Sequence, residues 1–244
     1  MSWYEESFGE DYLLVYRHRD NKHADQEVQE VAQWLDLSKG ETVLDLCCGT
    51  GRHSRSLARM GCQVTGIDLS EVLLSHAKSS PEELGIHYVR GDMRELPFAD
   101  QSFDTVVNLF TSFGYFMEDK ENAKVMTEIK RVLKPKGRFL IDFLNRNTVI
   151  NNLVPRSERM DEGIHILEER WIEGDFVRKK ITLTKKNGEE KIYQERVKMY
   201  TREQMEEMMG KAGLQIETVS GDFKGSSYNE IDSQRMIFTG RVPA

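Results

Sequence analysis

The segment 43–51, VLDLCCGTG, constrains the fold of this 244-residue chain more than any other part of it. A short, mostly apolar run that is typical of a buried strand leads directly into two glycines, and a helical pattern follows over 52–60. Glycine lets a ligand approach the backbone closely, and the start of a helix offers free N–H groups. The segment therefore predicts an α/β fold with a nucleotide-like ligand at the carboxyl end of this strand.

Further strands and helices are predicted to alternate along the first 145 residues. The apolar runs that indicate strands lie at 63–68, 87–92, 103–109 and 138–143. Among the helical patterns between them, 121–133 is the clearest, because its apolar residues recur every three or four positions. Ser70 stands where the N-cap of a helix belongs. This alternation predicts a doubly wound, mostly parallel sheet covered on both faces.

The pattern changes after residue 146. Three β-like runs, at 164–172, 176–184 and 190–199, are separated by Gly174-Asp175 and Asn187-Gly188, which are typical of hairpin turns. A helix over 201–212, with Thr201 and Gln204 placed for a capping box, and strands at 214–220 and 234–241 follow. We therefore expect a core with an N-terminal helical cap over 1–146, an antiparallel β insertion over 147–200, and the end of the core over 201–244. Two roles for the insertion remain open, a lid over the substrate and the surface of a homodimer.

Composition limits the partners. Lys and Arg total 34 and Asp and Glu total 41, a net charge of −7, whereas proteins that bind DNA usually carry a basic surplus. The sequence contains no apolar run long enough for a membrane helix, and the acidic start MSWYEE does not resemble a signal peptide. Three cysteines, without a CxxC or HExxH pattern, argue against a disulfide framework and a zinc site. We expect a cytoplasmic protein without a metal, a DNA partner or a membrane partner.

Polar residues at the ends of the predicted strands are candidate ligand contacts. Asp68 ends the second strand, where a carboxylate can accept hydrogen bonds from both ribose hydroxyls. Residues 91–93, GDM, end the third strand and suit an adenine, and Asn108 ends the fourth. A dinucleotide fingerprint would require a third glycine where Ser54 stands, which disfavours a nicotinamide-dependent oxidoreductase.

The successive segments VLDLCCGTGRHS, VTGIDLSEVLL, GDMRELPF, FDTVVNLFTSFGYF and LKPKGRFLIDF together resemble the class I S-adenosylmethionine (SAM)-dependent methyltransferases. Their order and spacing match that family over about residues 25–145. Both ends of the chain are similar to a bacterial subgroup that acts mostly on small molecules. The resemblance implies a seven-stranded Rossmann-like sheet with an antiparallel last strand, SAM as the cofactor and a small-molecule methyl acceptor.

The resemblance also implies roles for individual residues. The expected cofactor contacts are Asp45, Gly49 and Gly51 around the methionine portion, Asp68 at the ribose, Leu69, Asp92 and Met93 at the adenine, and Asn108 near the sulfonium. Arg19 and Tyr4 are the candidates for the cofactor carboxylate, with Arg17 and Tyr16 as competitors. The candidate acceptor contacts are Tyr115, Asn145, Tyr228 and Arg235.

Methyl transfer from a sulfonium is an in-line displacement, so alignment and a dry pocket are the main requirements on the protein. A general base is needed only if the acceptor keeps its proton at neutral pH. His53, His165 and Asp142 are possible bases, and the sequence does not choose between them. Two alternatives stay open at this point, a SAM-binding protein without methyl transfer and a methyltransferase that acts on protein or RNA.

Overall fold

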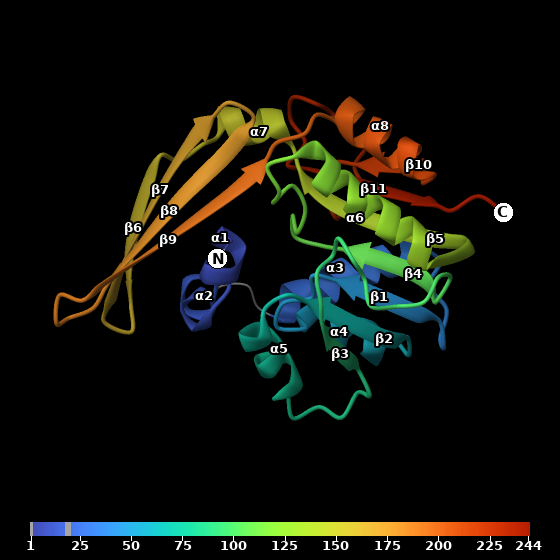
Figure 1. The fold of residues 1–244 in the computed structure, drawn as a ribbon, viewed down its shortest axis with the longest axis horizontal. Helices are drawn as coiled ribbons and strands as arrows, with labels where there is room; N and C mark the ends of the chain where they lie inside the picture. Colours follow the sequence, from blue (N-terminus) through green and yellow to red (C-terminus); the bar gives the residue numbers. More distant parts are fainter. Residues whose placement is uncertain (1, 18–20) are drawn as a thin grey trace.

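A seven-stranded sheet forms the centre of the molecule (Figure 1) in a computed structural model that describes residues 2–17 and 21–244. The strand order is β10-β11-β5-β4-β1-β2-β3, and β11 alone runs against its neighbours. The strands are β1 (Thr42–Leu46), β2 (Gln63–Asp68), β3 (His87–Arg90), β4 (Phe103–Asn108), β5 (Leu133–Leu144), β10 (Gln215–Ser220) and β11 (Arg235–Arg241). The predicted Rossmann-like sheet with an antiparallel last strand is confirmed.

Helices cover both faces of this sheet. They are α3 (Asn21–Trp34), α4 (Arg52–Arg59), α5 (Glu71–Lys78), α6 (Asp119–Val132) and α8 (Arg202–Ala212). Side chains alternate along each strand, so Leu44 of β1 packs in the cluster under α6 and α8, whereas Val43 packs in the cluster under α3 and α4. Each fully buried side chain of this size contributes about 1.5–3 kcal/mol of transfer free energy.

The ends of the helices follow the sequence signals. The Ser70 side chain accepts a hydrogen bond from the backbone N–H of Leu73 at the start of α5. Thr201 and Gln204 form the expected capping box at the start of α8, and Gly213 ends that helix with a φ of 83°. These local interactions fix where each helix begins or ends relative to the sheet.

A second, four-stranded antiparallel sheet follows the short helix α7 (Arg146–Asn151). Its strands, in spatial order, are β6 (Arg156–Asp161), β7 (Ile164–Glu173), β8 (Phe176–Thr184) and β9 (Glu190–Lys198). The prediction of three strands was incomplete, because β6 has the sequence RSERMD, which lacks the β-branched and aromatic residues that mark strands. Pairing with β7 along its whole length supplies the order that its own sequence does not.

The N-terminal helices α1 (Trp3–Ser7) and α2 (Glu10–Val15) lie between the small sheet and the large one (Figure 1). We call residues 2–17 the cap. Val15 packs against Ile166 and Ile181 of the small sheet. The Asp11 carboxylate accepts hydrogen bonds from Lys191 Nζ at 2.8 Å and from the Tyr193 hydroxyl at 2.5 Å. The cap is therefore anchored on the small sheet.

Within residues 2–17 and 21–244, none of the helices has the length and apolar character that a bilayer span requires.

Candidate active site

Two adjoining cavities lie where β1, β2, β3 and β4 end, beneath the cap. The first, of about 80 Å³, is lined by Tyr4, Phe8, Tyr12, Cys47, Gly49, Asp68, Leu69, Leu73, Gly91, Asp92, Met93, Ser112, Tyr115 and Phe116. The second, of about 190 Å³, is lined by Tyr12, Leu13, Tyr16, Arg17, Cys47, Cys48, Gly49, Thr50, Arg52, His53, Leu109, Phe110, Ser112 and Tyr115. Five residues line both, so the cavities are neighbours around the turn that follows β1.

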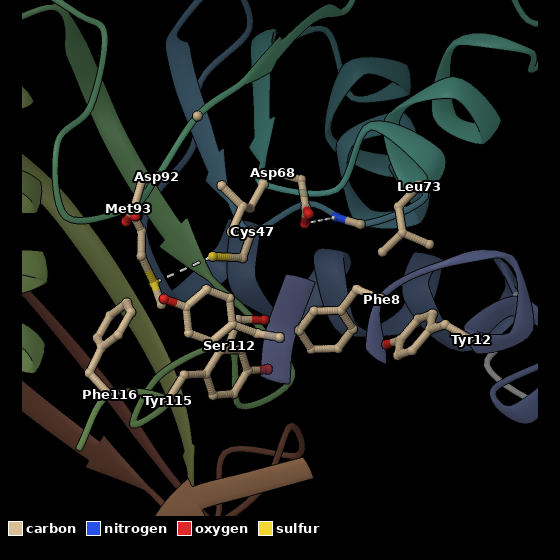
Figure 2. A pocket seen from close by; sticks show the side chains of 14 residues that line it. Phe8, Tyr12, Cys47, Asp68, Leu73, Asp92, Met93, Ser112, Tyr115 and Phe116 are labelled. Atoms are coloured by element: carbon tan, nitrogen blue, oxygen red, sulfur yellow. Dashed lines mark hydrogen bonds between the residues drawn. The ribbon is translucent and has the colours of Figure 1, made fainter. Parts of the chain in front are cut away.

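Figure 2 shows the first cavity between two walls. Asp68, Cys47 and Met93 come from the ends of strands, and the rings of Phe8 and Tyr115 face them. One Asp68 oxygen accepts a hydrogen bond from the backbone N–H of Gly49 at 2.8 Å, and the other accepts one from Ser70 N–H at 2.9 Å. Burial raises the pKa of Asp68 above its ordinary value, although the two hydrogen bonds act to lower it. The carboxylate is therefore held in one orientation at the cavity wall.

Asp92 forms the far end of this wall. Burial opposes its ionisation, but hydrogen bonds from the Arg94 side chain and backbone outweigh burial and lower the pKa of Asp92. The Arg94 guanidinium lies 2.6 Å from the Asp92 carboxylate and 4.3 Å from the ring centroid of Phe116. Next to Asp92, the side chain of Met93 is 8% exposed and its sulfur lies 3.6 Å from Cys47 Sγ. The Asp92 carboxylate therefore lies beside an apolar, polarisable surface formed by Met93 and Cys47.

The two glycines of the turn differ in their surroundings. Gly49 has a φ of 55°, and a Cβ on it would meet no atom within 4 Å, so open space lies in front of it. Gly51 has a φ of 73°, and a Cβ there would lie 2.2 Å from the Tyr88 hydroxyl oxygen. Gly51 is therefore required by packing, whereas Gly49 leaves room beside Asp68. This room next to a fixed carboxylate fits a nucleoside.

Three of the expected cofactor contacts lie behind the cavity wall. Asp45 is 2% exposed, and the Ser54 hydroxyl donates to it at 2.5 Å. Asn108 is also 2% exposed, donates from Nδ2 to the carbonyl of Leu46 at 3.0 Å, and has a buried Oδ1 without a partner in the described part of the chain. Neither these two nor Gly51 is among the lining residues, so they support the turn from behind.

The remaining expected cofactor contacts divide as follows. Tyr4, Gly49, Asp68, Leu69, Asp92 and Met93 all line the first cavity. The competitors Tyr16 and Arg17 line the second. Arg19 lies outside the described residues.

The second cavity is the more polar of the two. The Arg52 guanidinium lies 3.9 Å from the centroid of the Phe110 ring. His53 Nε2 lies 2.8 Å from a Glu27 carboxylate oxygen, and the His53 side chain is 6% exposed. Arg17 also lines this cavity, and its guanidinium is paired with Glu162 at 2.8 Å, while the Arg52 guanidinium lies 3.9 Å from Glu27.

A strained loop bounds this cavity. Phe110 and Thr111 both have left-handed backbone conformations, with φ values of 60° and 58°. The buried carboxylate of Asp142 accepts from Phe110 N–H at 2.8 Å and is ion-paired with Arg235, which also donates to the Thr111 hydroxyl at 2.8 Å. The pair of Asp142 and Arg235 therefore holds the loop in shape.

The three candidate bases, His53, Asp142 and His165, lie in different surroundings. His53 lines the second cavity. Asp142 is fully buried and already paired with Arg235. His165 lies on the small sheet, 3.1 Å from Glu158.

Of the four candidate acceptor contacts, Tyr115 lines both cavities. Asn145 is 1% exposed and donates to the carbonyl of Ser233 at 2.7 Å, and the Tyr228 hydroxyl lies 3.4 Å from Asn145 Oδ1. These two and Arg235 are absent from both linings and join the loops around them instead.

Sequence reasoning missed Phe8 and Tyr12, which line the first cavity from the cap. A signal was present, since Tyr4, Phe8, Tyr12 and Tyr16 recur at every fourth position. The rings of Phe8 and Tyr12 meet edge to face with centroids 5.1 Å apart, and those of Tyr12 and Tyr16 are tilted with centroids 4.5 Å apart.

Two other kinds of chemistry gain no support. Across the described ranges 2–17 and 21–244, no cluster of three or more His, Cys, Asp or Glu side chains could hold a metal ion. Burial, together with nearby carboxylates, raises the pKa of Cys47 and of Cys48 well above the ordinary value, which disfavours a thiolate nucleophile.

Comparison with known proteins gives consistent results. A family model described as "Methyltransferase domain" matches residues 43–137. The putative methyltransferase YqeM of Bacillus subtilis (strain 168) is 32% identical over 218 residues, which cover 84% of this chain and 87% of that protein.

Solved structures share the fold. A SAM-dependent methyltransferase from Clostridium acetobutylicum matches with a TM-score of 0.81 at 19% identity, covering 95% of this chain and 96% of the other. The SAM-bound amino pentose methyltransferase CalS10 from Micromonospora echinaspora matches with a TM-score of 0.71 at 21% identity, again covering 95% and 96%.

Proposed function

Because the chain belongs to the class I SAM-dependent methyltransferases and has SAM as its cofactor, we propose that it transfers the methyl group to a small molecule bound in the second cavity.

One observation carries this proposal: the two cavities meet at shared residues but differ in charge. The first holds the carboxylates of Asp68 and Asp92 and apolar walls, which suit the hydroxyls and ring of an adenosine. The second holds Arg52 and His53 beside the carboxylate of Glu27, which suit a polar acceptor. A cofactor in the first cavity would place its sulfur at the shared residues Ser112 and Tyr115, where the second cavity begins.

In this proposal the residues of the first cavity contact different parts of the cofactor. Asp68 accepts hydrogen bonds from the ribose hydroxyls, while Leu69 and Met93 contact the adenine ring and Asp92 accepts from its amino group. Gly49 gives the methionine portion access to the backbone. Tyr4 and Tyr12 close the site from the cap.

SAM, when bound, supplies a methyl group that is already activated by the sulfonium. The chain therefore has to align the acceptor and exclude water. The rings of Phe8, Tyr115 and Phe116 border the first cavity and would keep water away from the cofactor. The loop of Phe110 and Thr111, which Asp142 clamps, would fix the acceptor side.

The need for a base depends on the acceptor. An amine can lose its proton to water, whereas a hydroxyl needs a group within reach. His53 is the candidate base with a place in the lining, and Glu27 fixes its ring at 2.8 Å. We propose that positioning dominates and that His53 matters mainly for a hydroxyl acceptor.

A small acceptor is favoured over protein or RNA for two reasons. The second cavity lies beneath the cap and is bordered by Tyr12 and Tyr16. The net charge of −7 does not favour RNA. Among proteins of the same fold, the amino pentose methyltransferase CalS10 is named for a small acceptor.

The test is transfer of tritiated methyl from SAM to parallel panels of amino sugars, phenols, carboxylic acids, peptides and RNA. We expect turnover within one small-molecule panel. Transfer only to peptides or RNA would reject the small-molecule acceptor.

A histidine pair tests the role of the second cavity. His53→Gln should lower turnover about 100-fold on a hydroxyl acceptor and much less on an amine. His87→Gln, an exposed substitution on β3, is the matched control and should leave turnover unchanged. Equal losses in the two variants would contradict a role of His53 in the cavity.

A further inference from the structure

A small hollow of about 40 Å³ lies between α1 of the cap and the small sheet. In Figure 1, α1 lies beside β9, and the Ser7 hydroxyl donates to the backbone carbonyl of Gln194 in that strand. Among the described residues, none lines both this hollow and either of the two cavities beneath the cap. The hollow is therefore separate from the places proposed for the cofactor and the acceptor.

The register of the small sheet places two arginines side by side in this hollow. Trp171 of β7 lies opposite Arg178 of β8, which lies opposite Arg196 of β9, and all three line the hollow. Directly opposite residues project from the same face of a sheet, and like charges in such a pair are destabilising. Arg178 is ion-paired with Glu173, so one of the two charges is compensated within the chain.

Arg196 is the guanidinium that the described chain leaves uncompensated. Across residues 2–17 and 21–244 its side chain makes no ion pair, its buried Nε has no hydrogen-bond partner, and its guanidinium carbon lies 6.0 Å from the centroid of the Phe176 ring. Burial lowers the pKa of Arg196, and the charge of Arg178 lowers it further, although Tyr4 acts to raise it. A buried polar group without a partner is rare in folded proteins and is explained by a bound ion or water.

The other charged groups of the lining already have partners. Lys179 is ion-paired with Glu168, and its Nζ lies 2.8 Å from the Tyr16 hydroxyl. The Glu195 carboxylate accepts a hydrogen bond from the same hydroxyl at 2.7 Å, so it is held by the cap rather than by Arg196. With three cations and one carboxylate, the lining has a net positive charge.

The chemistry of the lining fits a small oxyanion. A guanidinium group binds a carboxylate or a phosphate through parallel N–H···O bonds that match its planar shape. The indole rings of Trp3 and Trp171 border the same space, and apolar walls strengthen an attraction between opposite charges. An anion here also separates the like charges of Arg178 and Arg196.

Trp3 links this hollow to the cofactor side of the cap. Its indole N–H donates to the backbone carbonyl of Tyr115 at 3.3 Å, and its ring centroid lies 5.2 Å from that of Tyr115 and 5.6 Å from that of Tyr4. Tyr4 and Tyr115 both line the first cavity. A ligand that holds Trp3 against the small sheet therefore also holds two walls of the first cavity.

We propose that Arg178 and Arg196, with Trp3 and Trp171, form a binding site for a small oxyanion, a carboxylate or a phosphate, between the cap and the small sheet. Because the bound anion fixes Trp3, it stabilises α1 over the first cavity and strengthens cofactor binding, and the cofactor strengthens anion binding by the same factor. The site does not depend on the identity of the acceptor. Its effect on the cofactor rests on the proposed place of the cofactor in the first cavity.

Calorimetric titration with inorganic phosphate and, separately, with acetate tests the site at constant ionic strength, because salt screens charges without specific binding. Wild type should bind at least one of the two anions, and the tighter probe tells a phosphate site from a carboxylate site. Arg196→Gln should bind that anion about 10-fold more weakly. The matched control is Arg156→Gln on β6 of the same sheet, whose side chain is 64% exposed, and it should bind as wild type does.

Two results of these titrations would overturn the site: binding of neither anion by wild type, or equal weakening in Arg196→Gln and Arg156→Gln. Melting curves show that the variant is folded. In anion-free buffer the thermal midpoint of Arg196→Gln should be no lower than that of wild type, because a like charge is removed from beside Arg178. The anion should raise the midpoint of wild type more than that of Arg196→Gln, and equal increases would contradict the role of Arg196.

The effect on the cofactor is measured separately. Saturating the site with its anion should tighten binding of S-adenosylhomocysteine about fivefold in wild type and leave Arg196→Gln unchanged. Unchanged affinity in wild type, with the anion bound, would overturn the coupling. Titration of Asp68→Asn with S-adenosylhomocysteine in anion-free buffer tests the place of the cofactor independently, so the two failures are distinguishable.

Fluorescence quenching gives a test that needs no substitution. Iodide is an anion that quenches indole fluorescence on contact, and Trp3 and Trp171 are two of the three tryptophans in the chain. The anion that binds in the titrations should reduce quenching by iodide but not quenching by neutral acrylamide. An equal effect on both quenchers, or no effect on iodide, would contradict an anion site between these rings.

Discussion

At the scale of residues, the two glycines of the turn after β1 separate binding from folding. Both have positive φ values, so a side chain at either position is strained. Only Gly49 faces open space, whereas Gly51 is enclosed by the ring of Tyr88. The same substitution should therefore have different consequences at the two positions.

We predict that Gly49→Ala lowers affinity for S-adenosylhomocysteine more than 10-fold at a stability cost of about 1 kcal/mol. Gly51→Ala should cost about 3 kcal/mol or more, because its methyl group would overlap Tyr88. Urea unfolding and calorimetric titration of both variants measure the two effects. The reverse pattern, with Gly51→Ala the more stable variant, would contradict this division.

Asp104 should account for part of the acid sensitivity of the fold. Burial opposes its ionisation, but hydrogen bonds from Lys134 and Thr42 outweigh burial and lower the pKa to about 2. Because the pKa is lower in the folded state, the stabilisation is present above about pH 4 and is lost as the pH falls toward 2.

The corresponding prediction concerns Asp104→Asn. Its thermal midpoint should lie below that of wild type at pH 6, and the gap should narrow steadily between pH 4 and pH 2.5. Melting curves over this pH range provide the measurement. A gap that stays constant down to pH 2.5 would show that the charge of Asp104 does not contribute.

At the scale of elements, the cap depends on the small sheet for its position. The bonds of Asp11 to Lys191 and Tyr193, and the Ser7 hydroxyl donating to the carbonyl of Gln194 at 2.9 Å, join the cap to β9. Asp11 itself lines neither cavity. Its influence on binding must therefore act through the placement of α1 and α2.

We predict that Asp11→Ala weakens S-adenosylhomocysteine binding about 10-fold, the equivalent of about 1.4 kcal/mol. Glu6→Ala, an exposed substitution on α1, serves as the control and should bind as wild type does. Calorimetric titration compares the three proteins. Unchanged affinity in Asp11→Ala would mean that the cap keeps its position without the sheet.

The elements show which parts of the fold the sequence predicts. Strands β2 and β4 are predicted within one residue, because they are apolar runs bounded by turn residues. β6 is not predicted, because its order comes from pairing with β7 rather than from its own residues. Phe8 and Tyr12 had only the four-residue spacing of the aromatic residues as a signal, because the short helices of the cap take their position from the surfaces around them.

At the scale of the whole molecule, the large sheet carries the residues proposed to bind the cofactor, and the small sheet anchors the cap above them. The large sheet brings Asp68 and Asp92 to one edge, which the order of its parallel strands allowed the sequence to predict. Asn145 and Tyr228 were expected beside the acceptor and instead join loops, because Asn145 donates to the carbonyls of Glu230 and Ser233 and Tyr228 donates to Asn145, all far away in the sequence. Tertiary contacts of that kind have no local signal.

The most direct test of the account is calorimetric titration of cofactor-free protein with S-adenosylhomocysteine, comparing wild type, Asp68→Asn and the exposed control Asp232→Asn. The account predicts micromolar binding by wild type and by the control, and a loss of about 10–100-fold in Asp68→Asn, because a charged acceptor is removed from the cavity wall. Equal affinity in all three folded proteins, or no binding by wild type, would contradict the assignment of the first cavity to the cofactor.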